Sequence, residues 1–519
     1  MKRDGSAGLS DGDLEAIVEA VVGKVQNRLE RNRHETGGCG RQHDPAPMAR
    51  RVETAVRQET EHIAAPFVAR KQVARAPEVM VRSARPGVHD DLDSAVQSAR
   101  DAFEQYEAMP LAVRHDVVRA MRRAALDVLD EMSERAVAET RLGRVEDKRI
   151  KNRVAITKTP GPEFLEPIAM SGDDGLMLLE RAPFGVICAI TPCTNPTETI
   201  FCNGLGMVAG GNSVLFNVHP LAKETSCWYV ELLNRAIASA GGPAELLNTL
   251  AEPSIKSAQA AMRHPGVRLV VVTGGGAVVT EAMNSGKRAV CAGPGNPPVV
   301  VDETAHLEVA ARGVIAGASF DNNIICTCEK EIIAVADIAD RLVRELERQG
   351  AHKLTPHELR KLEKTLLDSE GHVNRDFVGR NAGVLLGAAG RSGSDDLRML
   401  FAELPEDHPF VQTEMLMPVL GLVRQPDVES AIQCAKRVEH LYGHTAVMYS
   451  TNIDNLSRMA RVINASIFVK NAPNFAGIGA GGEGYTSWTI ASPTGEGLTT
   501  CRTFTRERRC TLKDHFRIV

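Results

Sequence analysis

FGVICAI, at residues 184–190, is a short apolar run that leads directly into Thr191 and Pro192. Three more apolar runs of strand length follow, with stretches of helical length between them, at residues 213–217, 267–272 and 298–301. Strands that alternate with helices are typical of a parallel, doubly wound sheet. We therefore predict an α/β fold with a ligand site at the carboxyl edge of the sheet, where the joints are rich in glycine and asparagine.

The chain divides into three zones by composition. Residues 1–30 carry an isolated amphipathic helical pattern, and residues 31–86 lack order signals and are interpreted as a partly disordered linker. From about residue 87 the chain is globular and begins with helical patterns at residues 92–106 and 114–140. Its length allows several domains.

The composition excludes several classes of protein. The 519 residues carry a net charge of -5 and no long basic run, which argues against a nucleic-acid binder. No apolar stretch approaches the roughly 18 residues that cross a bilayer, and no secretory signal opens the chain. The 11 cysteines are scattered without disulfide or zinc spacing, as in a reducing compartment. We expect a soluble cytoplasmic protein with no metal site.

A glycine-rich turn follows the third apolar run. Thr273, Gly274, Gly275 and Gly276 stand between that run and a helical stretch. Glycines let the backbone approach a ligand, and a helix N-terminus favours a negatively charged group such as a pyrophosphate. The turn lacks the G-x-G-x-x-G spacing of the usual dinucleotide motif, so an ordinary tight turn explains it equally well.

One cysteine stands in a distinctive setting. Cys326 lies in FDNNIICTCEK, residues 320–330, and such a cysteine is either an apolar filler or a nucleophile that reacts as its thiolate. The string resembles the active-site segment of the aldehyde dehydrogenase superfamily, and within it the CoA-acylating, propanal-oxidising branch of bacterial microcompartments. The resemblance spans about residues 87–519 and implies that Cys326 is the nucleophile and that Cys328 is not.

A second string matches the same family. In ITPCTNPT, residues 190–197, the resemblance makes Asn195 the side chain that donates to the oxyanion, together with the backbone N–H of Cys326. Attack on an aldehyde makes its carbonyl oxygen negative, and a donor preorganised for that charge is worth a few kcal/mol. The alternative is that Asn195 only caps a helix or closes an Asx turn before Pro196.

The resemblance also implies which residues hold the cofactor NAD. In that family a single glycine turn at this place binds the dinucleotide, which assigns Thr273, Gly274 and Gly275. Glu414 resembles a glutamate that holds the nicotinamide ribose, although a lone glutamate is ordinarily a solvated surface residue. Four residues at the ends of the first two strands are assigned to the cofactor as well: Thr191, Pro192, Asn217 and His219.

Two further segments match the acylating branch. His444 lies in GHTA, residues 443–446, which is near the active site in acylating relatives. It either assists proton transfer to or from CoA or is a structural histidine. The C-terminal segment from residue 491 resembles an arm that joins subunits, which implies a homodimer or a dimer of dimers.

An absence points to the acyl acceptor. Hydrolytic relatives carry a glutamate after the glycine turn that activates water, whereas this chain reads VCAGPGNPP at residues 290–298, with no carboxylate. Without a base, water cleaves a thioester poorly at neutral pH, but a thiol such as coenzyme A attacks it readily. The absence therefore favours acyl transfer to CoA.

The resemblance predicts an enzyme that oxidises a short-chain aldehyde with NAD and CoA, propanal first and acetaldehyde second. It implies two doubly wound α/β domains and an arm. These are an NAD-binding domain at residues 87–315 with a bridging hairpin near 174–185, a catalytic domain at 316–490 and an oligomerisation arm at 491–519. Three alternatives stay open: a hydrolytic aldehyde dehydrogenase, a non-catalytic family member with a structural role, and chemistry like that of glutamyl-phosphate reductase.

The N-terminal pattern suggests a partner. Apolar residues at helical spacing form one stripe between residues 14 and 29, and acidic residues at its start suit a helix N-terminus. A short amphipathic helix on a linker resembles the targeting peptides of microcompartment cargo, which dock in a groove of a shell protein. The alternative is a helix that packs on its own enzyme core; the face has too little basic charge for a membrane surface.

Overall fold

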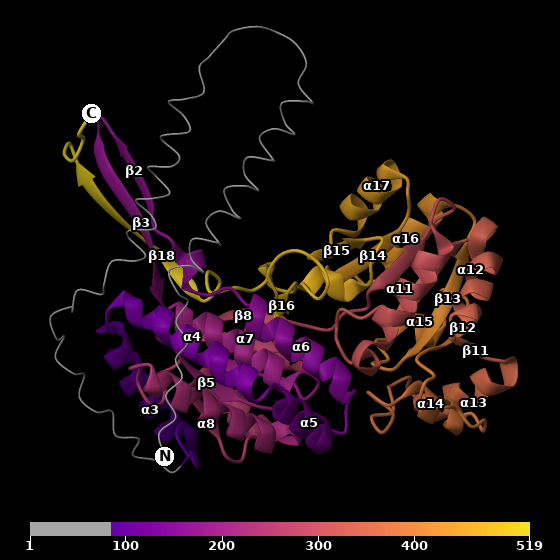
Figure 1. Cartoon of the computed structure of the whole chain (residues 1–519), viewed down its shortest axis with the longest axis horizontal. Coiled ribbons are helices and arrows are strands. Elements are labelled where there is room, and N and C mark those ends of the chain that lie inside the picture. The colour runs from indigo at the N-terminus through magenta and orange to yellow at the C-terminus, as the bar shows by residue number, and fades with distance from the viewer. Residues whose placement is uncertain (1–84) are drawn as a thin grey trace, which may run out of the picture. The chain divides into compact units, whose positions relative to one another are not determined.

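The computed structural model describes residues 85–519, in which two parallel sheets carry most of the strands (Figure 1). This confirms the predicted doubly wound α/β fold. The targeting helix expected at residues 1–30, and all but the last two residues of the linker, lie outside the described residues. Within residues 85–519, no helix is long and apolar enough to cross a membrane.

The first sheet has six strands in the order β1-β6-β5-β4-β7-β8. Its side chains alternate between two cores: Ile187 and Ala189 of β4 face one cluster, and Cys188 faces the other. Both faces are therefore covered by helices, as in a parallel sheet. The strands are Val88–His89, Leu247–Leu250, Ser213–Asn217, Val186–Ile190, Leu269–Thr273 and Arg288–Ala292; the helices of this lobe are α3 (Leu92–Glu107), α4 (Leu111–Asp127), α5 (Leu129–Thr140), α6 (Val145–Lys158), α7 (Pro196–Ala209), α8 (Lys223–Ser239), α9 (Ile255–Arg263) and α10 (Gly276–Met283).

The second sheet has seven strands in the order β11-β12-β13-β10-β9-β14-β15, and it is also parallel throughout. Helices α11 and α12 pack together, as do α16 and α17. The strands are His352–Lys353, Leu400–Glu403, Val419–Gln425, Glu331–Val335, Pro298–Val301, Thr445–Tyr449 and Ile467–Lys470; the helices are α11 (Leu307–Ser319), α12 (Ala336–Arg348), α13 (Pro356–Leu366), α14 (Ala382–Ala388), α15 (Pro409–Gln412), α16 (Val428–Val438) and α17 (Ile453–Ile463).

A small antiparallel sheet joins the hairpin to the end of the chain. Strands β2 (Ile168–Gly172) and β3 (Gly175–Pro183) form the hairpin, and β18 (Thr505–Lys513) pairs with β3 along its whole length. Figure 1 shows the three strands projecting away from the helices of the first lobe. Two shorter strands, β16 (Ile490–Ala491) and β17 (Gly497–Leu498), pair with each other.

Two expected boundaries differ from the structure. Strand β9 and helix α11 belong to the second lobe, so the chain changes sheet between Ala292 and Pro298 and not near residue 315. The sequence of an apolar strand does not indicate which of two sheets it joins, because tertiary contacts determine its pairing partners. The helix expected at residues 114–140 is two helices that meet at Val128, where ψ is 18° and no glycine or proline marks the break.

Candidate active site

A cavity of about 190 Å³ brings together segments of both lobes. It lies at the carboxyl ends of β4 and β7, beside the segment that precedes β10. Seven of the predicted site residues line it: Pro192, Asn195, Thr273, Gly274, Gly275, Cys326 and Glu414. The other four, Thr191, Asn217, His219 and His444, are not in its lining.

The segment before the nucleophile has a left-handed backbone. Asp321, Asn322 and Asn323 have φ of 49°, 53° and 67°, a conformation that Asn and Asp tolerate better than other side chains except glycine. The amide of Asn323 donates to Ala318 O at 2.7 Å and to Glu329 O at 2.9 Å. Buried Lys330 donates to Asn323 O at 2.9 Å and to its Oδ1 at 2.6 Å. Residues 321–323 therefore form a turn that is fixed by hydrogen bonds and leads into Cys326.

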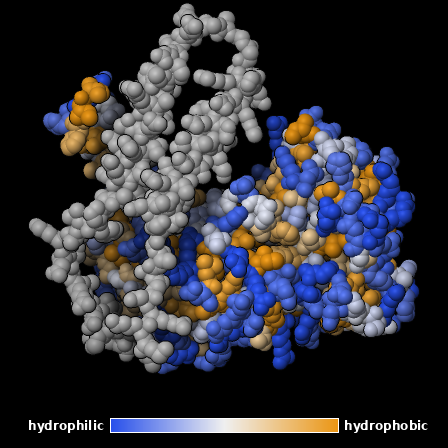
Figure 2. Space-filling view, viewed as in Figure 1, coloured by the Kyte–Doolittle hydropathy of each residue, from blue (hydrophilic) through white to orange (hydrophobic). Residues whose placement is uncertain are grey.

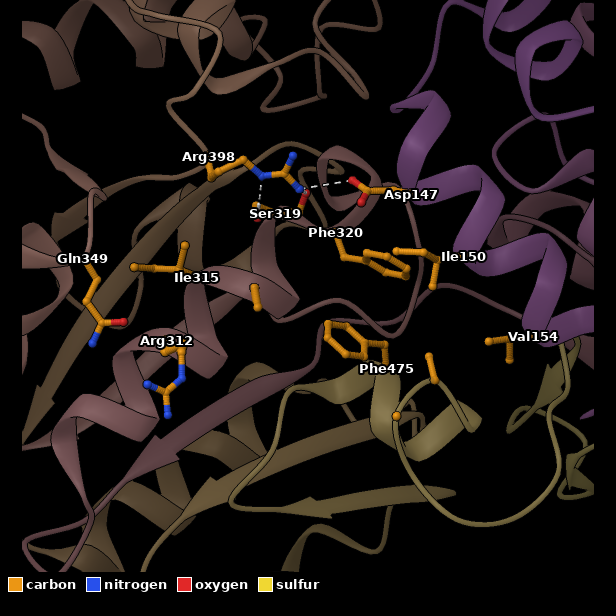
Figure 3. A pocket seen from close by; sticks show the side chains of 13 residues that line it. Asp147, Ile150, Val154, Arg312, Ile315, Ser319, Phe320, Gln349, Arg398 and Phe475 are labelled. Carbon is orange, nitrogen blue, oxygen red and sulfur yellow. Dashed lines mark hydrogen bonds and ion pairs between the residues drawn. The ribbon is translucent and has the colours of Figure 1, made fainter. Parts of the chain in front are cut away.

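A second set of contacts holds this turn from its outer side, in a cavity of about 540 Å³ between α6 and α11 (Figure 3). Arg398 donates to Ser319 O at 3.0 Å and to Asp147 Oδ2 at 3.1 Å. The same Asp147 oxygen accepts from the backbone N–H of Asp321 at 2.9 Å. The turn is thus fixed on both sides before any substrate arrives.

The two neighbouring cysteines differ in access. Cys326 lines the cavity and is partly exposed, whereas Cys328 is fully buried and its sulfur lies 3.6 Å from Phe320 O. Burial raises the pKa of the Cys326 thiol to about 12; the nearby Glu414 charge raises it further and Lys330 opposes both. Burial therefore favours the protonated thiol over the thiolate in the free protein.

Asn195 occupies the N-cap of α7 but does not cap it. Its side chain makes no bond to the first N–H groups of the helix. Its Oδ1 accepts from Lys151 Nζ at 2.5 Å, and its Nδ2 donates to Thr194 Oγ1 at 3.1 Å. Because Nδ2 carries two hydrogens, one N–H of this cavity-lining amide remains for a ligand. The alternative of a helix cap fails on this geometry.

Four fully buried charges stand behind Asn195, and the sequence analysis missed them. Lys151 lies 2.5 Å from Asp321 Oδ2 and 3.2 Å from Glu198 Oε1, and Lys148 lies 3.0 Å from Asp321 Oδ2. Both lysines lie on the buried face of α6, and nothing in the sequence marks that face as buried. Its residues are Asp147, Lys148, Lys151, Asn152, Ala155 and Ile156. Buried charges of this kind persist only when they are paired.

Glu414 is the one carboxylate among the described residues that line the cavity. It accepts a backbone hydrogen bond from Gly295, burial raises its pKa, and Lys330 opposes that shift. Gly293 and Pro294 line the cavity at the place where hydrolytic relatives carry their glutamate. Within the described chain, the cavity lining therefore contains one carboxylate, that of Glu414, and the segment after the glycine turn contributes none.

His444 lies behind the wall of the cavity. A Cβ built on Gly295 would stand 2.8 Å from Cys326 O and 3.0 Å from His444 Cγ, so the ring packs against this stretch of main chain. Its Nδ1 lies 2.9 Å from Thr445 Oγ1, and its buried Nε2 has no partner within residues 85–519. Burial lowers the pKa of His444 to about 4, which keeps the ring neutral at pH 7.

The glycine turn presents bare backbone to the cavity and fits a nucleotide. Gly275 is the N-cap of α10, and a Cβ on Gly275 or Gly276 would meet no atom within 4 Å. Thr191, at the end of β4, has a buried hydroxyl without a partner in the described chain. Asn217 and His219 are occupied locally: Asn217 Oδ1 accepts from Ser257 at 2.7 Å, and His219 Nδ1 accepts from Leu221 N at 3.1 Å.

The chain is similar to known proteins over most of its length. A model of the aldehyde dehydrogenase family matches residues 70–489. Acetaldehyde dehydrogenase (acetylating) EutE of Salmonella typhimurium is 49% identical over 439 residues, which cover 83% of this chain and 94% of that protein.

Solved structures share the fold at similar identity. The propionaldehyde dehydrogenase of Rhodopseudomonas palustris, with bound CoA and an acylated cysteine, has a TM-score of 0.81 at 48% identity and covers 82% of this chain and 98% of its own. The propionaldehyde dehydrogenase from the Clostridium phytofermentans fucose utilisation bacterial microcompartment has a TM-score of 0.82 at 42% identity, covering 84% and 100%.

Proposed function

The chain belongs to the aldehyde dehydrogenase family, and on that premise we propose that it converts a short-chain aldehyde to its acyl-CoA with NAD. The observation that carries the proposal is the cavity in which Cys326 and Asn195 meet without a water-activating glutamate after the glycine turn. Relatives named as acetylating acetaldehyde dehydrogenase and as propionaldehyde dehydrogenase support the same reaction class.

In the first half-reaction, the partly exposed Cys326 thiol gives its proton to solvent, and its sulfur bonds to the aldehyde carbon. The π electrons of the carbonyl move to oxygen, and this oxyanion accepts hydrogen bonds from Asn195 Nδ2 and the Cys326 N–H. NAD, when bound along the glycine turn and Glu414, supplies the acceptor for the hydride that leaves the carbon. The carbonyl re-forms, and a thioester on Cys326 remains.

In the second half-reaction, the thiolate of CoA attacks the thioester and the Cys326 thiolate leaves. Among the described residues that line the cavity, Glu414 is the one carboxylate, and it lies outside the segment in which hydrolytic relatives carry their water-activating glutamate. A hydrolytic enzyme is the alternative, and an assay of NADH formation with and without CoA decides between the two. We expect acyl-CoA with CoA present and little free acid in its absence; equal rates of acid formation would overturn the proposal.

The aldehyde is small and aliphatic. Around Cys326 the cavity is lined by Ile324, Ile325, Ile478, Ile490 and Trp488, and an alkyl group of one or two carbons needs no polar partner there. We propose propanal first and acetaldehyde next, although one methylene changes selectivity by only about 1–3 kcal/mol. A steady-state comparison of kcat/KM for C2, C3 and C4 aldehydes tests this; a clear preference for C2 or C4 would reverse the order.

Thr191, Asn217 and His219 stay proposed cofactor residues. They follow the carboxyl ends of β4 and β5, the edge at which doubly wound folds bind nucleotides. Thr191 is the strongest of the three, because its buried hydroxyl has no partner among the described residues. Isothermal titration of NAD against Thr191→Val and His219→Ala tests the assignment; unchanged affinity in both variants would remove them from the site.

His444 stays a proposed residue of the acyl-transfer step. Structures of the Clostridium phytofermentans enzyme exist with a cysteine and with a histidine replaced by alanine, and those two positions are separated by the same number of residues as Cys326 and His444. The ring packs on the main chain of Gly295 and Cys326, which supports a structural role beside the proton-transfer role. A loss confined to the CoA step in His444→Gln would favour proton transfer.

The arm and the N-terminal helix are proposed contact surfaces. Ile168, Met170 and Leu512 of the small antiparallel sheet are 52%, 63% and 39% exposed, which suits an arm that joins subunits in a dimer or dimer of dimers. The solved microcompartment relative supports shell association. Deleting residues 1–45 is expected to keep catalysis but prevent recruitment to a shell, and residues 1–30 are expected to direct a reporter there. A reporter that stays diffuse contradicts this.

A further inference from the structure

We propose that Lys151 is a positioning residue that sets the orientation of the oxyanion donor Asn195 and locks it to the turn that carries Cys326. The inference rests on the proposed role of Asn195. It is drawn from two contacts of the buried Lys151 ammonium group. The nitrogen donates to Asn195 Oδ1 at 2.5 Å, and it donates to Asp321 Oδ2, in the turn before Cys326, at 2.5 Å.

The orientation of the amide is decided by donor chemistry. An ammonium group has three donors and no acceptor, so it can bond only the oxygen end of Asn195. The Nδ2 end is thereby turned away from Lys151, where one of its hydrogens is free for the developing oxyanion. Without Lys151 the amide is free to rotate, and the reversed orientation would place its oxygen against a negative charge.

Lys151 is itself held from several sides. Glu198, one turn after Asn195 in α7, lies 3.2 Å from its nitrogen, and the Trp488 ring lies 5.3 Å below it. Lys148 and Lys151 balance Asp321 and Glu198, so the fully buried group has no excess charge. The two carboxylates also raise the pKa of Lys151, which keeps it protonated and excludes it as a general base.

Lys148 provides a matched control on the same helix. It is equally buried and shares Asp321, but its nitrogen donates to the Thr194 carbonyl at 2.6 Å and not to Asn195. Loss of either lysine leaves Asp321 with one cation. Only loss of Lys151 removes the contact that orients the amide.

The experiment compares Lys151→Met with Lys148→Met, Asn195→Ala and the double variant Lys151→Met with Asn195→Ala. Single-turnover NADH formation in the full-length enzyme gives the rate of acylation. We expect Lys151→Met to lose roughly 10- to 100-fold in this rate, bounded by the loss of about 10²–10³ for the donor itself. Aldehyde KM should stay near its original value, because the bond forms in the transition state. Lys148→Met should lose less than about threefold.

Two readouts separate positioning from a structural effect. In the Asn195→Ala background, Lys151→Met should cost less than about threefold more, since the residue it orients is gone. The pH profile of iodoacetamide alkylation at Cys326 should move only slightly to higher pH, because Lys151 contributes least among the groups that change the pKa of this thiol, and alkylation forms no oxyanion. If Lys151→Met does not fold, the double variant Lys151→Met with Glu198→Gln replaces it. That variant removes one charge of each sign from the buried group and still removes the contact between Lys151 and Asn195.

Additive losses in the double variant, or equal losses in Lys148→Met and Lys151→Met, would overturn the inference. A shift of the alkylation profile large enough to account for the lost acylation rate would also overturn it, because Lys151 would then act mainly on the thiol. The proposed function fails differently: near-normal turnover in Asn195→Ala would remove the oxyanion donor whatever Lys151 does.

Discussion

The two sides of the cavity are built in different ways. The side that carries the chemistry, around Asn195 and the Asp321–Asn323 turn, is fully buried and crossed by charged hydrogen bonds. The cofactor side, at Gly274, Gly275 and Gly276, is partly or fully exposed backbone with no side chains. The proposed oxyanion needs fixed donors, whereas bare backbone at the glycine turn leaves room for a nucleotide to approach. Figure 2 shows one face of the two lobes, on which hydrophilic groups and apolar patches are interspersed.

The largest effect is expected at the nucleophile. Cys326→Ala should abolish acyl-CoA formation, because no other cysteine among the described residues lines the cavity. Cys328→Ala, two residues away, should retain most activity, since its sulfur is buried and faces Phe320 O. Steady-state assays of NADH and acyl-CoA measure both. Loss of activity in Cys328→Ala but not in Cys326→Ala would show that Cys326 is not the nucleophile.

A smaller effect is expected on the cofactor side. A side chain in Gly275→Leu would project from the bare turn and compete with a nucleotide for the same space. We expect KM for NAD and for CoA to rise together by roughly tenfold, at constant alkylation rate of Cys326. Gly172→Ala, in the exposed hairpin with no atom near its Cβ, is the control. A rise for NAD alone would mean that the two ligands use separate space.

The smallest effect concerns stability against pH. His444 is buried neutral with its pKa lowered to about 4, below the ordinary value of 6.5. The unfolded chain therefore takes up this proton first as the pH falls, and stability is lost between about pH 6.5 and 4. The slope is roughly 1.4 kcal/mol per pH unit for one proton. Urea unfolding of His444→Gln should be less sensitive to pH over this range.

The surface residue His372 serves as the comparison for that measurement. His372→Gln removes a histidine that is 72% exposed, so it controls for the loss of one imidazole that is not buried. If His444→Gln and His372→Gln behave alike, burial of His444 does not contribute to acid sensitivity.

Much of the site could be predicted from the sequence because its parts lie in short local strings. Cys326 follows the DNN turn, Asn195 precedes a proline at a helix start, and the glycine turn follows a strand, so each has a local signature. The family resemblance supplied their roles. Glu414 needed the resemblance as well, since its own neighbourhood does not set it apart from a surface glutamate.

The charged network could not be predicted in the same way. Lys151 and Asp321 are 170 positions apart in the chain, and their contact exists only because α6 packs behind the turn. A lysine in a helix is ordinarily solvated, and only the fold shows that this face of α6 is buried. The sheet to which β9 belongs was missed for a related reason, because strand pairing is a long-range property.

The central claim is an acyl group on Cys326 that waits for CoA. Intact-mass spectrometry of the full-length enzyme, mixed with NAD and propanal in the absence of CoA, tests it directly. The account predicts one added propanoyl group per chain, mapped to Cys326 by peptide digestion and removed within seconds when CoA is added, with release of propanoyl-CoA. An unmodified protein that keeps producing NADH and free propanoate without CoA would contradict it.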